Sequence, residues 1–143
     1  MVLIDTNVLS YAVGVEHSLR APCRRLLDGH ATGRIELAAT VPVIQEFAHV
    51  RGRRRPRSDA VALALAFAMT LRLIDTQLGD LELGLALYAE HERLNAFDAV
   101  LAAVALNHRL EALVSADRAF GLVPGLRWID PAAHTLTELL SGD

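Results

Sequence analysis

The chain has 143 residues, of which 52% are hydrophobic, and a formal net charge of -3. This length corresponds to one domain, residues 1–143, with a sizeable core, and so weak a net charge excludes recognition of nucleic acid by bulk electrostatics alone. All 14 basic residues are arginines and Cys23 is the only cysteine, which excludes lysine-dependent chemistry, intramolecular disulfides and zinc–cysteine clusters and indicates a reduced, cytoplasmic protein.

Short apolar runs alternate with helical patterns in the first half of the chain. Gly29 is the expected stop of the second helix, and Pro42 suits the first turn of the third. No basic leader precedes Asp5, so we expect no signal peptide. The predicted elements are a strand over residues 2–4, a helix over 6–13, a helix over 18–30, a strand over 35–40 and a helix over 42–50.

A run of arginines interrupts the pattern at residues 51–57, which predicts a charged loop, with Ser58 or Asp59 capping the next helix. That helix contains the longest uncharged stretch, residues 60–71. It is shorter than the roughly 20 apolar residues that span a bilayer, so we interpret it as a core or subunit-interface helix and expect no membrane association.

The second half of the chain continues the alternation of strands and helices. The predicted elements are a strand over residues 71–74, helices over 76–91 and 96–110, and strands over 112–117 and 126–130. Short apolar strands that alternate with helices predict an α/β domain with a parallel sheet.

Four acidic residues stand out from this pattern. Asp5 and Asp117 each follow an apolar strand, where ligands of parallel sheets bind. Glu46 falls within the apolar stripe of its helix, and Asp98 opens a helix that is apolar on every face. Because buried carboxylates repel one another, a cluster of them favours protons or a divalent cation, and oxygen ligands suit Mg²⁺ or Mn²⁺.

Each acid also has a purely structural interpretation. Asp5 can cap the helix that follows it, and Asn95 with Asp98 resembles a capping box. Asp117 can be a turn residue, and Glu46 can extend from the edge of its helix into solvent. The set, more than any single member, indicates function.

The motifs that carry these acids are "VLIDTNVL", "VIQEFAHV", "NAFDAVLAAVA" and "LVSADRAF", followed by "GLRWIDP". In this order they resemble the PIN-domain ribonucleases, and among them the single-domain VapC-type toxins of bacterial toxin-antitoxin pairs. The resemblance covers residues 2–131. It implies a three-layer α/β/α fold in which a central, mostly parallel sheet is flanked by helices.

The resemblance also implies a site and a reaction. Asp5, Glu46, Asp98 and Asp117 become the acidic site, with Asp5 and Asp98 as metal ligands. The implied activity is that of a toxin endoribonuclease that hydrolyses RNA phosphodiester bonds with Mg²⁺ or Mn²⁺ and leaves 5′-phosphate and 3′-hydroxyl ends. The small polar residues that the family places beside its acids correspond here to Thr6, Asn7 and Ser115.

RNA affinity requires cations near this acidic pocket. The candidates are Arg51, Arg53, Arg54, Arg55 and Arg118. The arginine loop can equally be a solvated loop or the docking surface for an acidic antitoxin segment. The family further implies a homodimer and a VapB-type antitoxin partner. Asp75, in a second "LIDT" after Asp5, is expected only to cap a helix, with Thr76 as the competing cap.

Two other interpretations are weaker. A phosphoaspartate enzyme or receiver domain also places an aspartate after its first strand, but both classes usually need a lysine, which this chain lacks. The second alternative is a catalytically silent PIN fold that only binds RNA or protein. The complete set of four acids argues against it.

Overall fold

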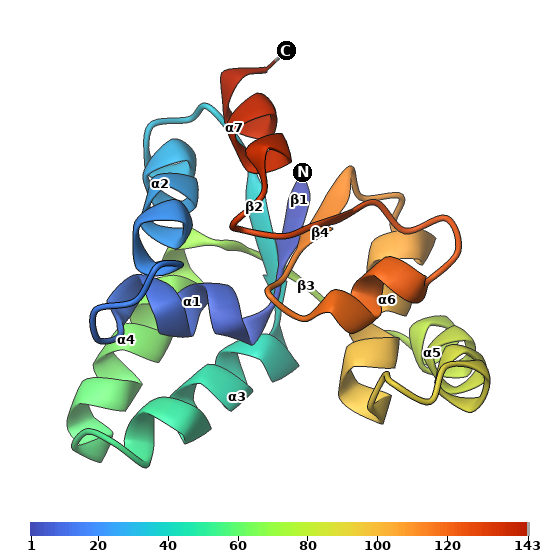
Figure 1. Ribbon diagram of the computed structural model, residues 1–143. Coiled ribbons are helices and arrows are strands. Elements are labelled where there is room, and N and C mark those ends of the chain that lie inside the picture. Colours follow the sequence, from blue (N-terminus) through green and yellow to red (C-terminus); the bar gives the residue numbers. More distant parts are fainter. Residues whose placement is uncertain (143) are drawn as a thin grey trace.

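Five strands of the computed structural model, which describes residues 1–142, form one parallel sheet in the order β3-β2-β1-β4-β5 (Figure 1). β1 lies in the centre, where Leu3 pairs with Ala38 of β2 and with Leu113 of β4. The all-parallel pairing confirms the predicted α/β class. The strands are β1 (Val2–Ile4), β2 (Leu37–Thr40), β3 (Arg72–Ile74), β4 (Ala112–Val114) and β5 (Trp128–Ile129).

Helices cover both faces of this sheet, as predicted. In Figure 1, α1 to α4 lie on one face and α5 and α6 on the other, while α7 packs against α2. The helices are α1 (Thr6–Val13), α2 (Arg20–Ala31), α3 (Val41–Gly52), α4 (Arg57–Thr70), α5 (Leu78–Glu90), α6 (Ala96–Asn107), α7 (His134–Ser141) and the 3₁₀ helix η1 (Arg118–Leu122).

The strand order reverses between β1 and β4. The chain leaving β1 passes to the face covered by α1 to α4, whereas the chain entering β4 comes from α5 and α6 on the other face. Ligands of open parallel sheets bind at such a switch point, outside the carboxyl ends of the strands. The residues that follow those ends are Asp5 after β1 and Ser115 after β4.

The central strands are buried on both faces, which explains why they are apolar throughout. Val2, Leu3 and Ile4 have 0% exposed surface. Each such side chain stabilises the fold by roughly 1.5–3 kcal/mol relative to exposure. The carboxyl ends of β1 and β4 are therefore fixed by the core of the protein.

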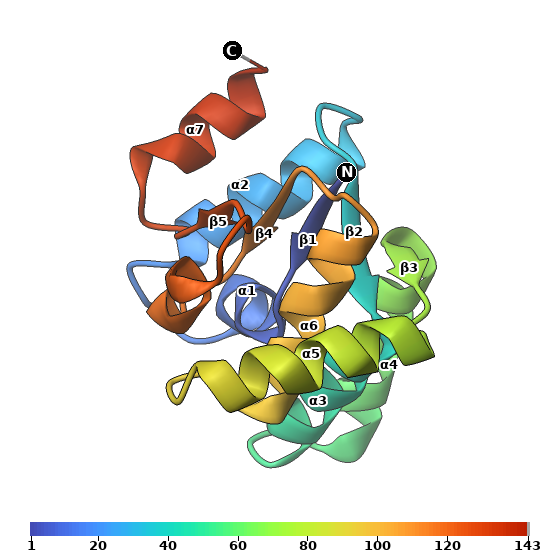
Figure 2. The same cartoon turned by 90° about the vertical axis from the view of Figure 1, so that its right-hand side faces the viewer.

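α5 and α6 approach each other closely at Gly84, as Figure 2 shows for the two helices. A Cβ atom at Gly84 would lie 2.6 Å from Cα of Val100. Only glycine permits this approach, and it fixes α6, which carries Asp98, against the outer helix.

The predicted stop of the second helix at Gly29 is wrong, because α2 continues to Ala31. Gly29 is instead buried, and a Cβ there would lie 2.8 Å from Leu140 of α7. Thr32 is the C-cap of α2, and Gly33 follows it with a φ of +74°, a conformation that favours glycine.

The arginine loop is shorter than predicted. α3 extends through Gly52 and α4 begins at Arg57, so that only residues 53–56 lie outside helices. The predicted caps Ser58 and Asp59 are also wrong, since both lie inside α4 and the N-cap is Pro56. Asp59 instead forms a 2.9 Å ion pair with Arg51 across the turn.

The predicted capping role of Asp75, and of Thr76 as its competitor, is wrong as well. The N-cap of α5 is Gln77, which forms a capping box with the buried Asp80. Asp80 also accepts hydrogen bonds from Asn107 at 2.8 Å and His108 at 3.4 Å, so it joins the start of α5 to the end of α6. Neither α7 nor the 3₁₀ helix was predicted.

The uncharged stretch in α4 is only partly in the core. Ala60 and Ala64 are buried, whereas Val61, Leu65 and Met69 are 53%, 58% and 85% exposed. An apolar stripe therefore remains on its outer surface. Within residues 1–142, no helix combines the length and the apolar character that crossing a bilayer requires.

Candidate active site

Asp5 is the most deeply placed acid, with 6% exposure. It caps α1, because its Oδ1 accepts a 2.7 Å hydrogen bond from the backbone N–H of Thr6. Its Oδ2 accepts from the Asn7 amide at 3.0 Å and from the Ser115 hydroxyl at 2.7 Å. Asp5 is thus both a helix cap and a carboxylate at the switch point of the sheet.

Thr6 and Asn7 connect Asp5 to the neighbouring segments. The Thr6 hydroxyl lies 3.2 Å from the carbonyl oxygen of Val43 and 3.1 Å from Oε2 of Glu46. Both acceptors belong to α3, so the hydrogen bond that this hydroxyl donates links α1 to α3. The Asn7 amide oxygen accepts from the backbone N–H of Ala116 at 3.1 Å. Both residues lie beside the acids, where the sequence placed them.

Ser115 is the third polar neighbour, and it is fully buried. Its hydroxyl donates to Asp5 and accepts from the Asn7 amide and from the Asp117 backbone N–H, both at 3.0 Å. Its carbonyl accepts from the indole N–H of Trp128 at 2.8 Å. Every polar group of Ser115 that faces the site is therefore paired, which fixes the orientation of Asp5.

Asp98 lies in the first turn of α6 and is half-buried. The side chain of Asn95, the N-cap, accepts from the Asp98 backbone N–H at 2.8 Å and donates its amide to the Asp98 carboxylate at 3.0 Å. The capping interpretation of Asn95 is confirmed. The carboxylate nevertheless still faces the site.

Glu46 is exposed, although its two apolar neighbours Val43 and Phe47 are buried. The expectation that Glu46 lies within the apolar stripe is therefore wrong, because this position of α3 faces an open hollow that Asp5 also lines. Its carboxylate still reaches the site through the Thr6 hydroxyl.

Asp117 is also exposed and acts as the N-cap of η1, with its Oδ1 accepting from the Ala119 N–H at 2.9 Å. The proposed turn role is thus real. Its backbone N–H bonds the Ser115 hydroxyl, which ties the loop to Asp5.

One cavity of about 500 Å³ collects all four predicted acids. They come from four separate segments: the end of β1, the middle of α3, the start of α6 and the loop after β4. The residues that line this cavity include Asp5, Glu46, Asp98, Asp117, Thr6, Asn7, Ser10, Tyr11, His17 and Arg54. For the acids, the sequence prediction of a shared hollow is confirmed.

The pKa values of two acids reflect this convergence. The pKa of Asp98 is raised to about 7, chiefly by burial and in addition by the negative charges of Asp5, Asp117 and Glu46. Burial also raises the pKa of Asp5, although hydrogen bonds from Ser115 and Thr6 oppose the shift. A cation that replaces the proton would stabilise the ionised form of carboxylates whose pKa is raised in this way.

The donor set fits a hard divalent cation, since it consists of carboxylate oxygens near hydroxyl and amide groups. Among residues 1–142, no three histidine, cysteine or acidic side chains stand close enough to share one ion in the present arrangement. Asp5 is buried and accepts three hydrogen bonds, whereas the exposed Glu46 and Asp117 each accept one. The donor types therefore fit such an ion by chemistry.

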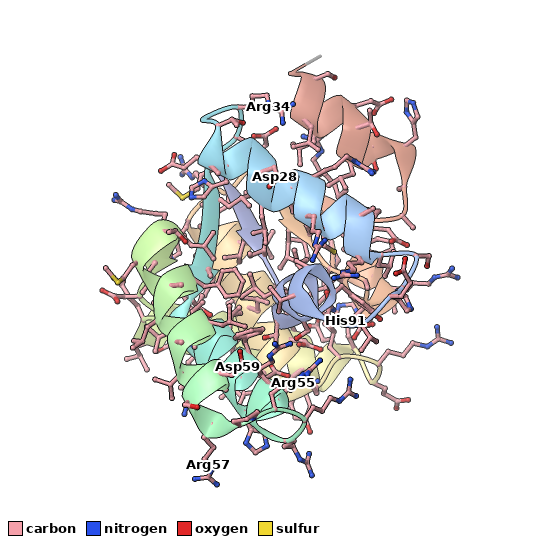
Figure 3. The ribbon with its side chains drawn as sticks, turned by 90° about the vertical axis from the view of Figure 1, so that its left-hand side faces the viewer. Asp28, Arg34, Arg55, Arg57, Asp59 and His91 are labelled. Carbon is pink, nitrogen blue, oxygen red and sulfur yellow. The ribbon has the colours of Figure 1, made fainter. Side chains whose placement is uncertain are left out.

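The five candidate arginines differ in their surroundings. Arg51 is largely buried, pairs with Asp59, and donates to the Val13 carbonyl at 3.0 Å, so its guanidinium already holds the ends of three helices together. Arg54 lines the acidic cavity. Figure 3 shows the arginine turn, with Arg57 reaching into solvent. Arg53, Arg55 and Arg118 are exposed, and RNA contact by this set stays a prediction.

Two aromatic side chains in the acidic cavity were not predicted. Tyr11 and His17 stack with ring centroids 4.6 Å apart and form part of the lining. Tyr11 follows Asn7 by one helical turn, and that spacing was the available signal. His17 lies in the α1–α2 connection, whose path no sequence pattern indicates.

A family model described as PIN domain matches residues 2–126. Ribonuclease VapC7 of Mycobacterium tuberculosis is 44% identical to this chain over 142 residues, and the match covers 98% of each chain. Ribonuclease VapC13 of the same organism is 31% identical over 133 residues, which cover 89% of this chain and 98% of VapC13.

Solved structures show the same fold at lower identity. VapC20 of Mycobacterium tuberculosis, described as a Sarcin-Ricin loop cleaving toxin, is similar with a TM-score of 0.71 at 17% identity and covers 85% of this chain and 93% of its own. VapBC2 from Rickettsia felis, bound to a DNA fragment from their promoter, has a TM-score of 0.70 at 18% identity and covers 91% and 98%.

Proposed function

The chain belongs to the PIN-domain family, among the VapC ribonucleases, and on that premise we propose that it is the toxin of a toxin-antitoxin pair and a Mg²⁺- or Mn²⁺-dependent endoribonuclease. The observation that carries the proposal is the single cavity lined by Asp5, Glu46, Asp98 and Asp117. Four carboxylates beside one another have little structural use, because each raises the cost of ionising the others.

The roles follow from the contacts of each residue. Asp5 and Asp98 would hold the cation, with Glu46 and Asp117 completing the set. A bound divalent ion supplies Lewis acidity and charge neutralisation at the scissile phosphate. Ser115 and Asn7 orient Asp5 through hydrogen bonds of 2.7 and 3.0 Å, and Thr6 orients Glu46 through a bond of 3.1 Å.

RNA would reach the acids along the side that carries Arg54. This guanidinium lines the same cavity and can pair with a phosphate that approaches Asp5 and Asp98. Arg53 and Arg55, which flank Arg54, and Arg118, which follows Asp117, are exposed and would offer further cations to the RNA backbone. Arg51 is already committed to Asp59 and Val13, so we assign it a structural role.

The partner would be a VapB-type antitoxin, as in the VapBC2 complex from Rickettsia felis. Because the acids repel one another when no cation is present, a cationic side chain of an antitoxin inserted among them would compete with metal and RNA together. A homodimer remains the second expected assembly. The apolar stripe of Val61, Leu65 and Met69 on α4 offers a surface for it.

The alternative is a catalytically silent PIN fold that binds RNA or protein. One experiment separates the two: purified protein is incubated with a structured RNA and Mn²⁺, with and without EDTA, beside Asp5→Ala. The enzyme gives fragments with 5′-phosphate ends that EDTA and the substitution both abolish. Fragments that survive both treatments would come from a contaminant, and binding without cleavage would support the silent module.

A further inference from the structure

Phe97 is 79% exposed, although it directly precedes Asp98 in the first turn of α6. Consecutive helical residues point in different directions, so the carboxylate faces the acidic cavity while the ring faces a second hollow. This second hollow, here called the apolar groove, has a volume of about 810 Å³. An exposed aromatic ring that is continuous with an apolar hollow beside a polar site is typical of a ligand-binding surface.

The apolar groove is lined by residues of α5, α6 and α3; Figure 2 shows α5 in front of α6. Asp5 and Glu46 line both the apolar groove and the acidic cavity, so the two hollows are continuous at these carboxylates. The apolar part of the groove wall includes Leu81, Leu85, Ala96, Phe97, Val100 and Leu101.

A basic hollow adjoins the groove on the side of α3. His49 lines the apolar groove and also this smaller hollow, which contains Arg53 and Arg57. A ligand bound at the acids therefore has an apolar wall with Phe97 within reach and cationic side chains beyond His49. These surfaces match a nucleotide chain, which presents flat, weakly polar bases and anionic phosphates.

An apolar protein surface that brings no cationic side chain is a poorer occupant of this groove. An apolar partner seated in it would cover the carboxylates of Asp5 and Glu46 without a counter-charge, which is unfavourable. A nucleotide instead leaves the acids to the cation and the phosphate and presents only its base to the ring.

We propose that Phe97 is the stacking platform for the nucleobase next to the phosphodiester bond that the acids cleave. The proposal rests on the proposed ribonuclease function and adds a positioning residue to it. Since stacking requires an exposed base face, the nucleotide at this position must be unpaired. The ring then fixes the scissile phosphate relative to Asp98, one residue away.

The test compares Phe97→Ala with the wild-type protein on an RNA oligonucleotide that contains the bond cleaved by the wild type. Stacking on an aromatic side chain predicts a loss of about tenfold or more in kcat/KM, expressed mainly as a higher KM. Phe97→Trp should restore the wild-type value. On a matched oligonucleotide that is abasic beside the cleaved bond, the two proteins should become equal, because the base that stacks is gone.

Tyr88→Ala is the matched control. Tyr88 is 49% exposed on α5 and lies outside the groove lining, so its removal should leave KM unchanged. The proposal is wrong if Phe97→Ala and the wild type have equal kcat/KM on the intact RNA. It is also wrong if the loss of kcat/KM in Phe97→Ala persists on oligonucleotides that are abasic on either side of the cleaved bond. A shared loss of dimer in Phe97→Ala and Tyr88→Ala by light scattering also contradicts it, since that result would assign the face to a second copy.

A binding measurement separates this proposal from the proposed function. Fluorescence anisotropy of the same oligonucleotides with Asp98→Asn, with and without Phe97→Ala, needs no cleavage. Suppose that the wild type cleaves no RNA, but that Phe97→Ala weakens binding of the intact oligonucleotide and leaves binding of the abasic oligonucleotide unchanged. The stacking role of Phe97 is then supported, whereas the proposed ribonuclease function is wrong. If binding is unchanged, the stacking role is wrong.

Discussion

Asn95 and Asp98 hold each other at the start of α6: the Asn95 side chain donates to the Asp98 carboxylate at 3.0 Å and accepts from the Asp98 backbone N–H at 2.8 Å. The same carboxylate lines the acidic cavity, and its pKa is raised to about 7. Helix capping favours an acceptor at this position, whereas burial and the neighbouring acids oppose a charge. Replacing the Asp98 carboxyl group by an amide separates the two effects, because the amide keeps a hydrogen-bond acceptor and removes the charge.

Asp98→Asn should abolish cleavage and leave the metal-free protein as stable as the wild type or more so. Because the pKa of Asp98 is raised from 3.8 to about 7, the wild type loses stability as the pH rises through this interval, and asparagine does not. We expect a gain on the order of 1 kcal/mol at about pH 8 and none near pH 4. Urea unfolding in EDTA at both pH values measures it. Lower stability with activity retained would mean that Asp98 serves only the helix.

The raised pKa of Asp98 also predicts how metal binding depends on pH. A cation must displace the proton, so Mn²⁺ affinity should rise with pH by up to about tenfold per unit and level off above about pH 7. Calorimetric titration of the wild type and of Asp98→Asn at several pH values tests this. The slope should flatten in the variant, and an equal slope in both proteins would assign the proton to another group.

Ser115→Ala should weaken metal binding or activity by about 10- to 100-fold, because the hydroxyl that aims Asp5 is lost. Asn7 and the Asp117 backbone N–H also lose their acceptor, so the free energy of unfolding should fall by about 1–3 kcal/mol. Ser141→Ala, which removes only a hydroxyl bonded to Glu138 of α7, is the control. Wild-type Mn²⁺ affinity in Ser115→Ala would show that Asp5 needs no such partner.

Arg51 and Arg54 should behave differently when each is replaced by alanine. Arg51→Ala should lower the free energy of unfolding by about 1–3 kcal/mol, because the Val13 carbonyl and Asp59 lose their partner. Arg54→Ala should leave stability unchanged, raise KM for RNA and reduce the slope of log KM against log salt by about 0.7. Arg25→Ala, exposed on α2, is the control for charge alone. A salt slope unchanged in Arg54→Ala would remove this arginine from the RNA path.

Gly84→Ala should destabilise the protein, although alanine is normally favoured over glycine in helices by about 0.5–1 kcal/mol. The new methyl group would lie 2.6 Å from the backbone of Val100, so α5 must move away from α6 at a cost of about 1–3 kcal/mol. Gly79→Ala in the same helix has no heavy atom within 4 Å of the new Cβ and should be neutral or stabilising. Thermal unfolding of the two variants decides, and equal melting temperatures would show that the interface adapts.

Much of the fold was predictable because the pattern of apolar residues within one segment is enough to identify a strand or a helix. The strand of residues 2–4 was found from its continuous apolar run and the helix after it from the helical spacing of its apolar residues, and the four acids were singled out from their place in these patterns. What failed were boundaries that depend on distant contacts. Gly29 resembles a helix stop until Leu140 packs on it, and the arginine turn shortens because Arg51 pairs with Asp59.

The details of the site had similar limits. Periodicity placed Glu46 among apolar neighbours, but only the packing of α3 beside the hollow that Asp5 lines determines that its carboxylate is exposed. Gln77 was overlooked as a cap because its role depends on Asp80, which in turn is held by Asn107 from another helix. A residue whose partner lies far along the chain gives no local signal.

The 2.7 Å bond between Ser115 and Asp5 joins residues 110 positions apart, and β1 lies in the sheet between β2 and β4. During translation the first aspartate therefore leaves the ribosome long before the serine that orients it exists. A nascent chain has no assembled acid cluster until β4 has been synthesised and has docked. The acidic site is therefore among the last features of the fold that a growing chain can assemble.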